Sequence, residues 1–369
     1  MHRKQITFDY IEMDTGGVHR GKIRPANRES LREWLAEFTE HFPGKQAAIA
    51  VEATTGWRYV VEELERAGVE PHLAEPAQTK ALQGPKKRAK TDRLDAGHLR
   101  DLMVIERLPE SWIPPEHIQE IRTLMRLRHS LIEERTTHKQ RIHSQLFHNG
   151  YPQQKNLDSI EGRAQLEDME LPGAARQVVD LSLAMIDHIN EELEPVEAQL
   201  RAYARSQAGC KALMEHYYGV GELTSVALLS ELGDTRRFSN SKKAVRFAGM
   251  DITVHSSDDK RAAGKLSRQG PPTLRWAAFE VAKRAWRKGS PDHDYYVHNK
   301  ERIGANRAAL AIARKLIRRA HHTIGELGEE AMSEPVAASE AIAEMDRDSQ
   351  EEGHREGSCA QRNPTEAMS

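Results

Sequence analysis

Two hydrophobic patterns divide the chain into an N-terminal and a C-terminal part. In residues 5–75, short apolar runs alternate with amphipathic stretches, which is typical of an α/β domain. Residues 5–12 alternate polar and apolar positions, and residues 18–23 follow a Gly-Gly turn, so the two segments predict a β-hairpin. The nearly continuous apolar run 47–53 predicts a strand covered on both faces, and a short strand is expected at 71–74.

Two amphipathic helices are expected between these strands. The first can be capped by Asn27 or by Ser30, because either side chain can accept a hydrogen bond from the first helical turn. The second follows the strand at 47–53 and ends at Gly68. We place the boundary of this α/β domain at residues 115/116.

Beyond residue 118 the apolar spacing becomes helical. One long helix covers 121–147, and a second follows a Gly/Pro break at 150–152. The second helix has apolar residues at alternating spacings of three and four, which is the seam of a coiled coil: Ile186, Ile189, Leu193, Val196, Leu200 and Tyr203. Residues 116–208 therefore predict an antiparallel helical hairpin or a dimerisation arm, with a plain bundle as the alternative. Residues 209–327 predict a helical domain.

The net charge of −2 averages two regions of opposite sign. Residues 328–369 hold 11 acidic and 3 basic residues, which leaves a net charge of +6 on the first 327. A mildly basic body suits nucleic-acid partners, and the acidic tail, poor in large apolar residues, is expected to be disordered. Two cysteines cannot form a disulfide framework, and no apolar stretch approaches the length of a membrane span or signal core. We expect a cytoplasmic protein.

Three acidic residues are candidate metal ligands. Glu52 ends the apolar run in VEATTGW, and Asp92 and Asp95 lie three residues apart in KTDRLDA. Carboxylates at a strand end and on one helix face can hold Mg²⁺, since hard cations need oxygen ligands on a rigid scaffold. The spacing alone favours a simpler alternative, in which the two aspartates lie on a solvated helix and Glu52 is a structural acid.

Four basic residues precede those aspartates: Lys86, Lys87, Arg88 and Lys90. Such a run usually lies in a solvated loop. Beside an acidic metal site it would instead attract a phosphate backbone.

A glycine pair lies between two helical stretches in Tyr217–Asp234. Gly219 and Gly221 resemble the turn of a helix-hairpin-helix motif, in which glycines permit a positive φ and backbone amides approach a phosphate. An ordinary helix–helix turn is the alternative.

The segment His255–Trp276 is rich in serine, glycine and basic residues. Ser256 or Ser257 could act as a nucleophile in a phosphate-binding environment, and a flexible loop is the alternative. The basic residues of this segment would neutralise phosphates: Lys260, Arg261, Lys265, Arg268 and Arg275.

The ordered motifs VEATTGW, KTDRLDA, GVGELTSVALLSELGD, FAGM and SRQGPPTLRW resemble one family across about residues 1–327. This family is that of the DEDD/serine insertion-sequence transposases, the bridge-RNA-guided recombinases of mobile elements. The resemblance implies an RNase H-like, RuvC-type domain that holds Mg²⁺ with four acids. It also implies a helical hairpin and a C-terminal transposase domain with a nucleophilic serine.

The resemblance further implies partners and a reaction. Strand exchange would pass through a covalent phosphoserine link to double-stranded donor or target DNA, and a structured guide RNA would select both. A homodimer or tetramer associated with the bacterial or archaeal nucleoid is expected.

The family pattern assigns roles residue by residue. Glu52 matches the second acid, and Asp92 and Asp95 match the third and fourth. The distance to Gly264 selects Ser257 as the nucleophile, although Asp258 stands where the family usually has glycine and Ser256 is an adjacent competitor.

The first acid departs from the pattern. Family members open with a strand reading hydrophobic-Gly-hydrophobic-Asp, whereas this chain opens MHRKQ. Asp9 lies in the next strand between Phe8 and Tyr10, which argues against it as the replacement. We expect a chain about ten residues short, through a misplaced start codon or a degraded gene copy, that lacks the central strand of its sheet and has poor activity. A non-catalytic nucleic-acid-binding relic and a RuvC-like nuclease that cuts with metal-activated water are the rival functions.

Overall fold

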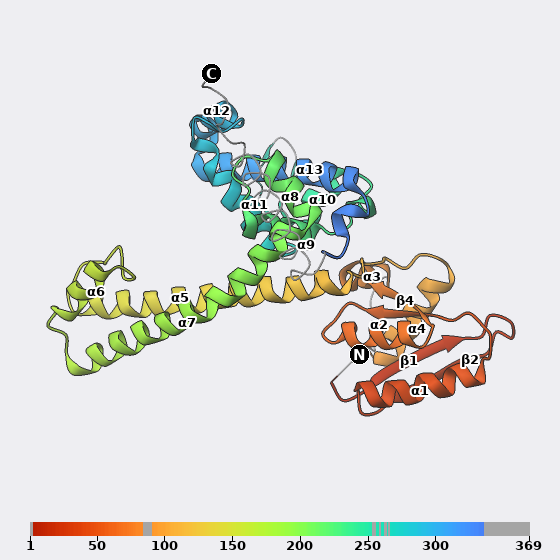
Figure 1. Cartoon of the computed structure of the whole chain (residues 1–369). Coiled ribbons are helices and arrows are strands. Elements are labelled where there is room, and N and C mark those ends of the chain that lie inside the picture. Colours follow the sequence, from red (N-terminus) through yellow and green to blue (C-terminus); the bar gives the residue numbers. More distant parts are fainter. Residues whose placement is uncertain are drawn as a thin grey trace, which may run out of the picture. The chain divides into compact units, whose positions relative to one another are not determined.

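The computed structural model describes residues 3–83, 91–252, 256–257, 260–261, 264 and 266–335. The chain forms two compact units, Met1–Ile113 and Pro114–Ser369 (Figure 1). The first unit is α/β and the second is almost entirely helical, as the two hydrophobic patterns predict.

The first unit contains two separate two-stranded sheets. Strands β1 (Ile6–Ile11) and β2 (Val18–Ile23) form the expected antiparallel hairpin, and β3 (Ala48–Glu52) pairs in parallel with β4 (Glu70–Ala74). The helices of this unit are α1 (Arg28–His41), α2 (Trp57–Arg66), α3 (Pro76–Leu82) and α4 (Asp92–Val104).

The hairpin depends on a close contact between a ring and a glycine. Phe8 lies opposite Gly21 in the register, and a Cβ on residue 21 would stand 2.4 Å from the Phe8 ring. Only glycine leaves room for the ring there, so this pair fixes how the two strands pack.

The core of the first unit lies between the helices and the β3–β4 sheet. Leu31 and Leu35 of α1 pack with Val60 and Leu64 of α2 in one buried cluster, which also contains residues of β3 and β4. The side chain of Asn27, one of the two expected caps, accepts a hydrogen bond from the Ser30 amide.

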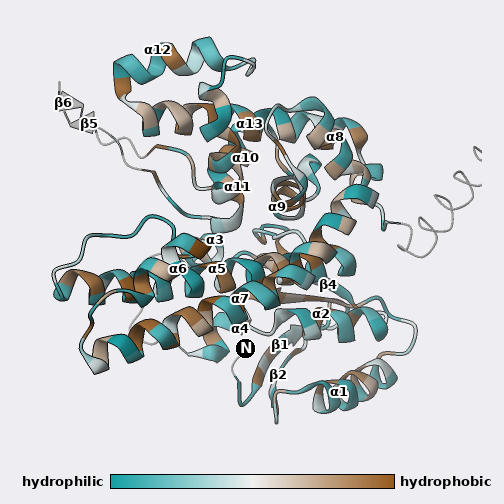
Figure 2. Ribbon diagram, turned by 60° about the vertical axis from the view of Figure 1, so that its left-hand side comes forward, coloured by the Kyte–Doolittle hydropathy of each residue, from teal (hydrophilic) through white to brown (hydrophobic). Residues whose placement is uncertain are grey.

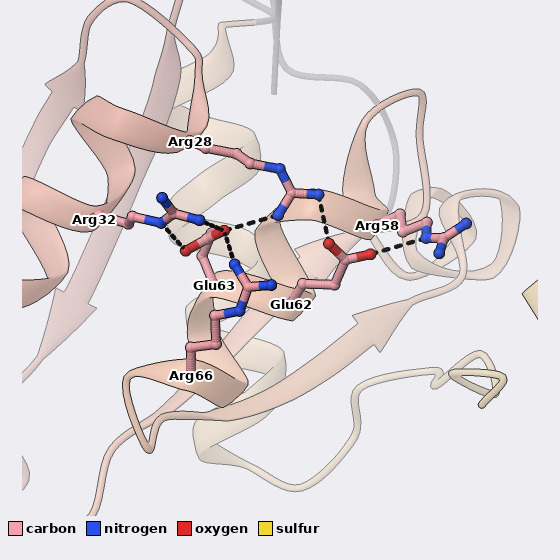
Figure 3. A network of polar contacts seen from close by, with 6 residues as sticks. All are labelled: Arg28, Arg32, Arg58, Glu62, Glu63 and Arg66. Carbon is pink, nitrogen blue, oxygen red and sulfur yellow. Dashed lines mark hydrogen bonds and ion pairs between the residues drawn. The ribbon is translucent and has the colours of Figure 1, made fainter. Parts of the chain in front are cut away.

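A network of ion pairs joins α1 to α2 (Figure 3). The side chain of Glu63 is 1% exposed and contacts Arg28, Arg32 and Arg66 at 2.5–2.9 Å. Arg28 also reaches Glu62, which pairs with Arg58. The two helices are therefore held together by ion pairs as well as by their apolar residues.

The expected strand at 47–53 forms, but it is not covered on both faces. Only Val51 of β3 is buried, whereas Ala48 is exposed and the remaining strand residues are half-buried. The prediction of complete burial was wrong because this strand borders a cavity.

The second unit begins with a long antiparallel helical hairpin of α5 (Glu116–His148) and α7 (Gly173–Ser206), which lie side by side in Figure 1. The short helix α6 (Ile160–Glu167) lies near the hairpin tip, where Leu157 and Leu166 pack with Ile142 and Leu146. All six residues of the predicted seam are buried.

The rest of this unit is a helical bundle around α9 (Glu222–Leu232), whose residues 225–232 are all buried. Because α9 consists mostly of apolar residues (Figure 2) and is buried all round, it needs cover on every side, and it packs against α5, α7, α8 and α11. The helices around it are α8 (Ala208–His216), α10 (Ser241–Phe247), α11 (Pro272–Lys283), α12 (His293–Ile303) and α13 (Ala305–Leu327). The short elements are η1 (Thr235–Arg237), β5 (Ser256–Ser257), β6 (Lys260–Arg261), η2 (Arg284–Trp286) and η3 (Glu330–Met332).

The hairpin and the helical bundle belong to one unit. Arg122 of α5 donates a hydrogen bond from Nε to the Ser230 carbonyl of α9 at 2.7 Å. None of the helices in the described part of the chain is long and apolar enough to span a membrane.

The first residues of the acidic tail are ordered, contrary to expectation. Ala331 is buried, and Gln207 Nε2 donates to the carbonyls of Ala331 and Ser333 at 3.2 and 3.0 Å. Composition predicted disorder from residue 328, but these backbone contacts hold 328–335 against α8. Residues 336–369 lie outside the described residues.

Candidate active site

Glu52 is placed by the end of β3. It is the last residue of that strand, opposite Ala74 of β4, and the chain turns directly after it to enter α2. Gly56 supports this turn with a φ of +94°, a conformation that favours glycine. The half-buried Glu52 side chain therefore lies at the carboxyl end of a strand, as the sequence predicts.

Asp92 and Asp95 are placed by the start of α4. Thr91 caps this helix, since its Oγ1 accepts a hydrogen bond from the Leu94 amide. Both aspartates thus lie in the first helical turn, which confirms the expected helical segment. Asp92 accepts from Gln5 Nε2 at 3.4 Å, and Asp95 accepts from Gln83 Nε2 at 3.0 Å.

All three acids line one cavity of the first unit. It has a volume of about 880 Å³ and is lined by residues of β1, β3, α1 and α4, including Glu52, Asp92 and Asp95. Apolar side chains such as Phe8 and Leu99 make up much of the remaining lining. The candidate ligands that sequence reasoning took from two distant segments therefore face the same space.

Asp9 lines the same cavity but is already paired. Its side chain is 1% exposed, and its two oxygens contact Arg20 Nε at 2.6 Å and Arg100 Nη1. These two arginines leave no free carboxylate oxygen, which favours a structural role for Asp9. Sequence reasoning found neither arginine, because Arg20 lies 11 and Arg100 lies 91 residues away from Asp9.

The three candidate ligands differ from Asp9 in their charge environment. Within the described residues, Glu52, Asp92 and Asp95 form no ion pair with lysine or arginine, and two of them contact only neutral amides. A cation in the cavity would supply the positive charge that these carboxylates lack among the described residues.

The oxygen atoms of the three candidate ligands are of the type that binds a hard cation. All three candidates offer carboxylate oxygens, which Mg²⁺ prefers. Their side chains do not converge, however: across the part of the chain that the structure describes, no group of three His, Cys, Asp or Glu residues is arranged to hold a metal ion.

The candidate serine lies in a short β-hairpin. Ser257 in β5 pairs with Lys260 in β6, and Ser256 pairs with Arg261. For these four residues the structure describes the backbone pairing. The loop places both serines next to basic residues, and the choice between Ser256 and Ser257 stays open.

The base of this serine loop is clamped. Ile252 forms an antiparallel bridge with Leu266, and the Ser267 hydroxyl donates to the Asp251 carboxylate. The Arg268 amide donates to the Gly249 carbonyl at 3.0 Å. Sequence reasoning missed the Asp251–Ser267 pair, because nothing in their local sequence signals a contact across 16 positions.

The predicted glycine turn forms between α8 and α9. Gly219 has the expected positive φ of +84°, but Gly221 is extended, with a φ of −115°, and acts as the N-cap of α9. Gly221 therefore does not use the positive φ that a glycine permits. Its amide donates to Thr224 Oγ1 at 2.9 Å, so this N–H is already used within the helix start.

The basic residues expected to contact phosphates differ in how much of them the structure describes and in their exposure. Arg268 is exposed, whereas Arg275 Nη1 donates to the carbonyls of Gly270 and Ala248 and so ties α11 to the preceding turn. Lys260 and Arg261 are described by their backbone in β6. The others fall outside the described residues: Lys86, Lys87, Arg88, Lys90 and Lys265.

Comparison with known proteins identifies the family. Residues 4–148 match a DEDD-type IS110 transposase model, and residues 211–297 match the model described as the IS116/IS110/IS902 transposase family. The chain is 23% identical over 289 residues to the transposase for insertion sequence element IS1111A of Coxiella burnetii, covering 73% of this chain and 76% of that protein. It is 24% identical over 277 residues to the putative transposase y4rJ of Sinorhizobium fredii, covering 69% and 68% of the two chains. The two family models match both the acidic segment and the bundle, and the chain belongs to the DEDD insertion-sequence transposases of the IS110 type, enzymes that move DNA.

Proposed function

We propose that this transposase cuts and exchanges DNA strands through a covalent phosphoserine link formed by Ser257, with Mg²⁺ held by Glu52, Asp92 and Asp95. The observation that carries the proposal is the cavity whose wall holds these three acids without a lysine or arginine partner among the described residues. The metal, when bound, supplies positive charge next to the scissile phosphate.

The serine step replaces one phosphodiester linkage with another, so no bond energy has to be supplied from outside. The Ser257 hydroxyl loses its proton and forms a new bond to phosphorus, and the bond between phosphorus and one sugar oxygen breaks. That oxygen leaves as a hydroxyl after it takes up a proton. Attack on the phosphoserine by a hydroxyl of a second DNA strand then completes the exchange: a new bond to phosphorus forms, the bond to the serine oxygen breaks, and the serine is released with its proton restored. The clamp between Asp251 and Ser267 supports the proposal because it fixes the base of the serine loop.

Guidance by a structured RNA and pairing of subunits are part of the same proposal. Both rest on the family resemblance and on the long hairpin, whose α5 and α7 provide an extended surface. We also propose that the turn at Gly219, as part of a helix-hairpin-helix, and the basic candidates of residues 86–90 and 260–275 contact the DNA backbone.

The nucleophile is tested by trapping the intermediate. Wild-type protein and the variants Ser257→Ala and Ser256→Ala are incubated with labelled element-end DNA, the element RNA and Mg²⁺, then denatured. A denaturation-resistant adduct should form with wild type and Ser256→Ala but not with Ser257→Ala, while all three bind DNA equally. An adduct in Ser257→Ala would refute the assignment, and cleavage without any adduct would favour the nuclease that uses metal-activated water.

A further inference from the structure

A second candidate surface lies in the bundle, away from the serine loop in sequence. The ten residues Val281–Ser290 contain four basic residues, one tryptophan and no acid. The sequence analysis did not identify this segment, although basic residues beside an aromatic residue are a recognised signal of nucleic-acid binding.

The structure turns this segment outward. Ala285 is buried and anchors η2, whereas the neighbouring Arg284, Trp286, Arg287 and Lys288 are all exposed. The Trp286 side chain is 61% exposed, an unusual position for the largest apolar side chain. Its indole is therefore available to a ligand.

The turn between α8 and α9 extends this surface. Arg284 Nη1 donates to the Gly219 carbonyl at 3.3 Å, and a Cβ on residue 219 would stand 3.2 Å from the Arg284 side chain. The Tyr218 hydroxyl lies 3.9 Å from the Cβ position of residue 289. Two exposed aromatic rings, Tyr218 and Trp286, thus come from segments that pack against each other.

The charge of the surface remains largely uncompensated. Lys283 pairs with Glu280 at 2.6 Å, whereas the Arg287 guanidinium lies 5.9 Å from the Trp286 ring centroid. No ion pair to Arg284, Arg287 or Lys288 occurs within the described residues. Positive charge alone would suit duplex DNA, but exposed aromatic rings are of use when bases are free to stack on them.

We propose that Tyr218, Arg284, Trp286, Arg287 and Lys288 form a binding site for unpaired nucleotides, which bases occupy by stacking on Trp286. The biological use of this site rests on the proposed strand-exchange function. Strand exchange leaves DNA strands unpaired, and a structured RNA has unpaired loops, so either could supply the nucleotides. Binding itself requires neither the metal nor Ser257. A failure of this site and a failure of the proposed chemistry are therefore distinguishable.

The test measures binding of the full chain to three probes in EDTA: a 12-nucleotide oligothymidylate, the matching oligouridylate and a 12-base-pair duplex. Trp286→Ala should weaken binding of the single strands about tenfold or more, since stacking of a base on an aromatic ring contributes that much. Duplex affinity should change less than about twofold. Trp286→Phe should restore most of the single-strand affinity, because a phenyl ring still stacks.

Phe147→Ala is the matched control, since Phe147 is 81% exposed on the hairpin and residues 142–152 around it contain no lysine or arginine. Arg287→Gln combined with Lys288→Gln should reduce the salt dependence of single-strand binding by about 1.4 in log–log slope. The proposal is overturned if Trp286→Ala behaves as Phe147→Ala does, or if it weakens duplex and single strands equally. Tighter binding of oligothymidylate identifies a DNA strand as the ligand, and tighter binding of oligouridylate identifies RNA.

Discussion

The ion-pair network between α1 and α2 allows a quantitative prediction about stability. Its three arginines lower the pKa of Glu63 from 4.5 to about 2, with the hydrogen bond from Arg32 as the largest cause. At about 1.4 kcal/mol per pKa unit, this shift corresponds to at most about 3.5 kcal/mol. The arginine side chains are 43–61% exposed, so solvent screens their charge, and we expect about 2 kcal/mol.

The substitution Glu63→Gln removes this charge while it keeps the size of the side chain. At pH 7 the first unit of the variant should unfold with a free energy about 2 kcal/mol below that of wild type. Because the pKa of Glu63 is lower in the folded state, its contribution is complete above pH 4.5 and is lost as the pH falls toward 2. The difference between the two proteins should therefore shrink over that range.

Urea denaturation at pH 7, 5, 4 and 3 measures this difference, with tryptophan fluorescence as the probe. Glu62→Gln is the matched control: Glu62 also contacts two arginines, but it is 24% exposed, so its loss should cost less. Equal destabilisation by both substitutions, or a Glu63→Gln deficit that persists unchanged at pH 3 and below, would refute the reasoning.

Three further predictions concern single residues. Burial raises the pKa of the Cys210 thiol to about 12, so in a Cys359→Ala background this thiol should react with a disulfide reagent only after urea is added. Gly270→Ala should lower the stability of the second unit by more than about 2 kcal/mol in thermal melts, because residue 270 has a φ of +142° and its Cβ would stand 1.9 Å from the Phe247 carbonyl oxygen. Asp9→Asn should destabilise the first unit by about 2–4 kcal/mol, since it leaves two arginines without their buried partner, yet Mn²⁺ binding should be unchanged once folding is restored at low temperature.

Local patterns in the sequence were sufficient for most of the elements. The alternation in 5–12 and 18–23 predicts the hairpin of β1 and β2, and the spacing of the seam predicts the buried face of α7. These signals are local because they depend on which side chains share one face of a strand or helix. The division between an α/β unit and a helical unit follows from them.

The features that were missed depend on contacts between distant segments. The tail residues 328–335 are held by Gln207, whose amide reaches two carbonyls more than 120 positions away. Asp9 is fixed by Arg100, and the serine loop is clamped by Asp251 and Ser267. Periodicity and composition carry no information about such pairs. The residues next to Asp9 or Asp251 in the sequence look the same whether or not that side chain has a distant partner.

The surroundings of Asp92 and Asp95 bear on the two interpretations of the D-x-x-D motif. Three structural acids of the first unit, Asp9, Glu62 and Glu63, pair with arginines. Asp92 and Asp95 lie at the start of α4, where the helix dipole favours their negative charge, yet they contact only glutamine amides at the wall of a cavity that Glu52 also lines. Spacing alone could not separate these cases, because the same sequence fits both. We propose that these acids are ligands because all three line one cavity and carboxylate oxygens are the donors that Mg²⁺ prefers.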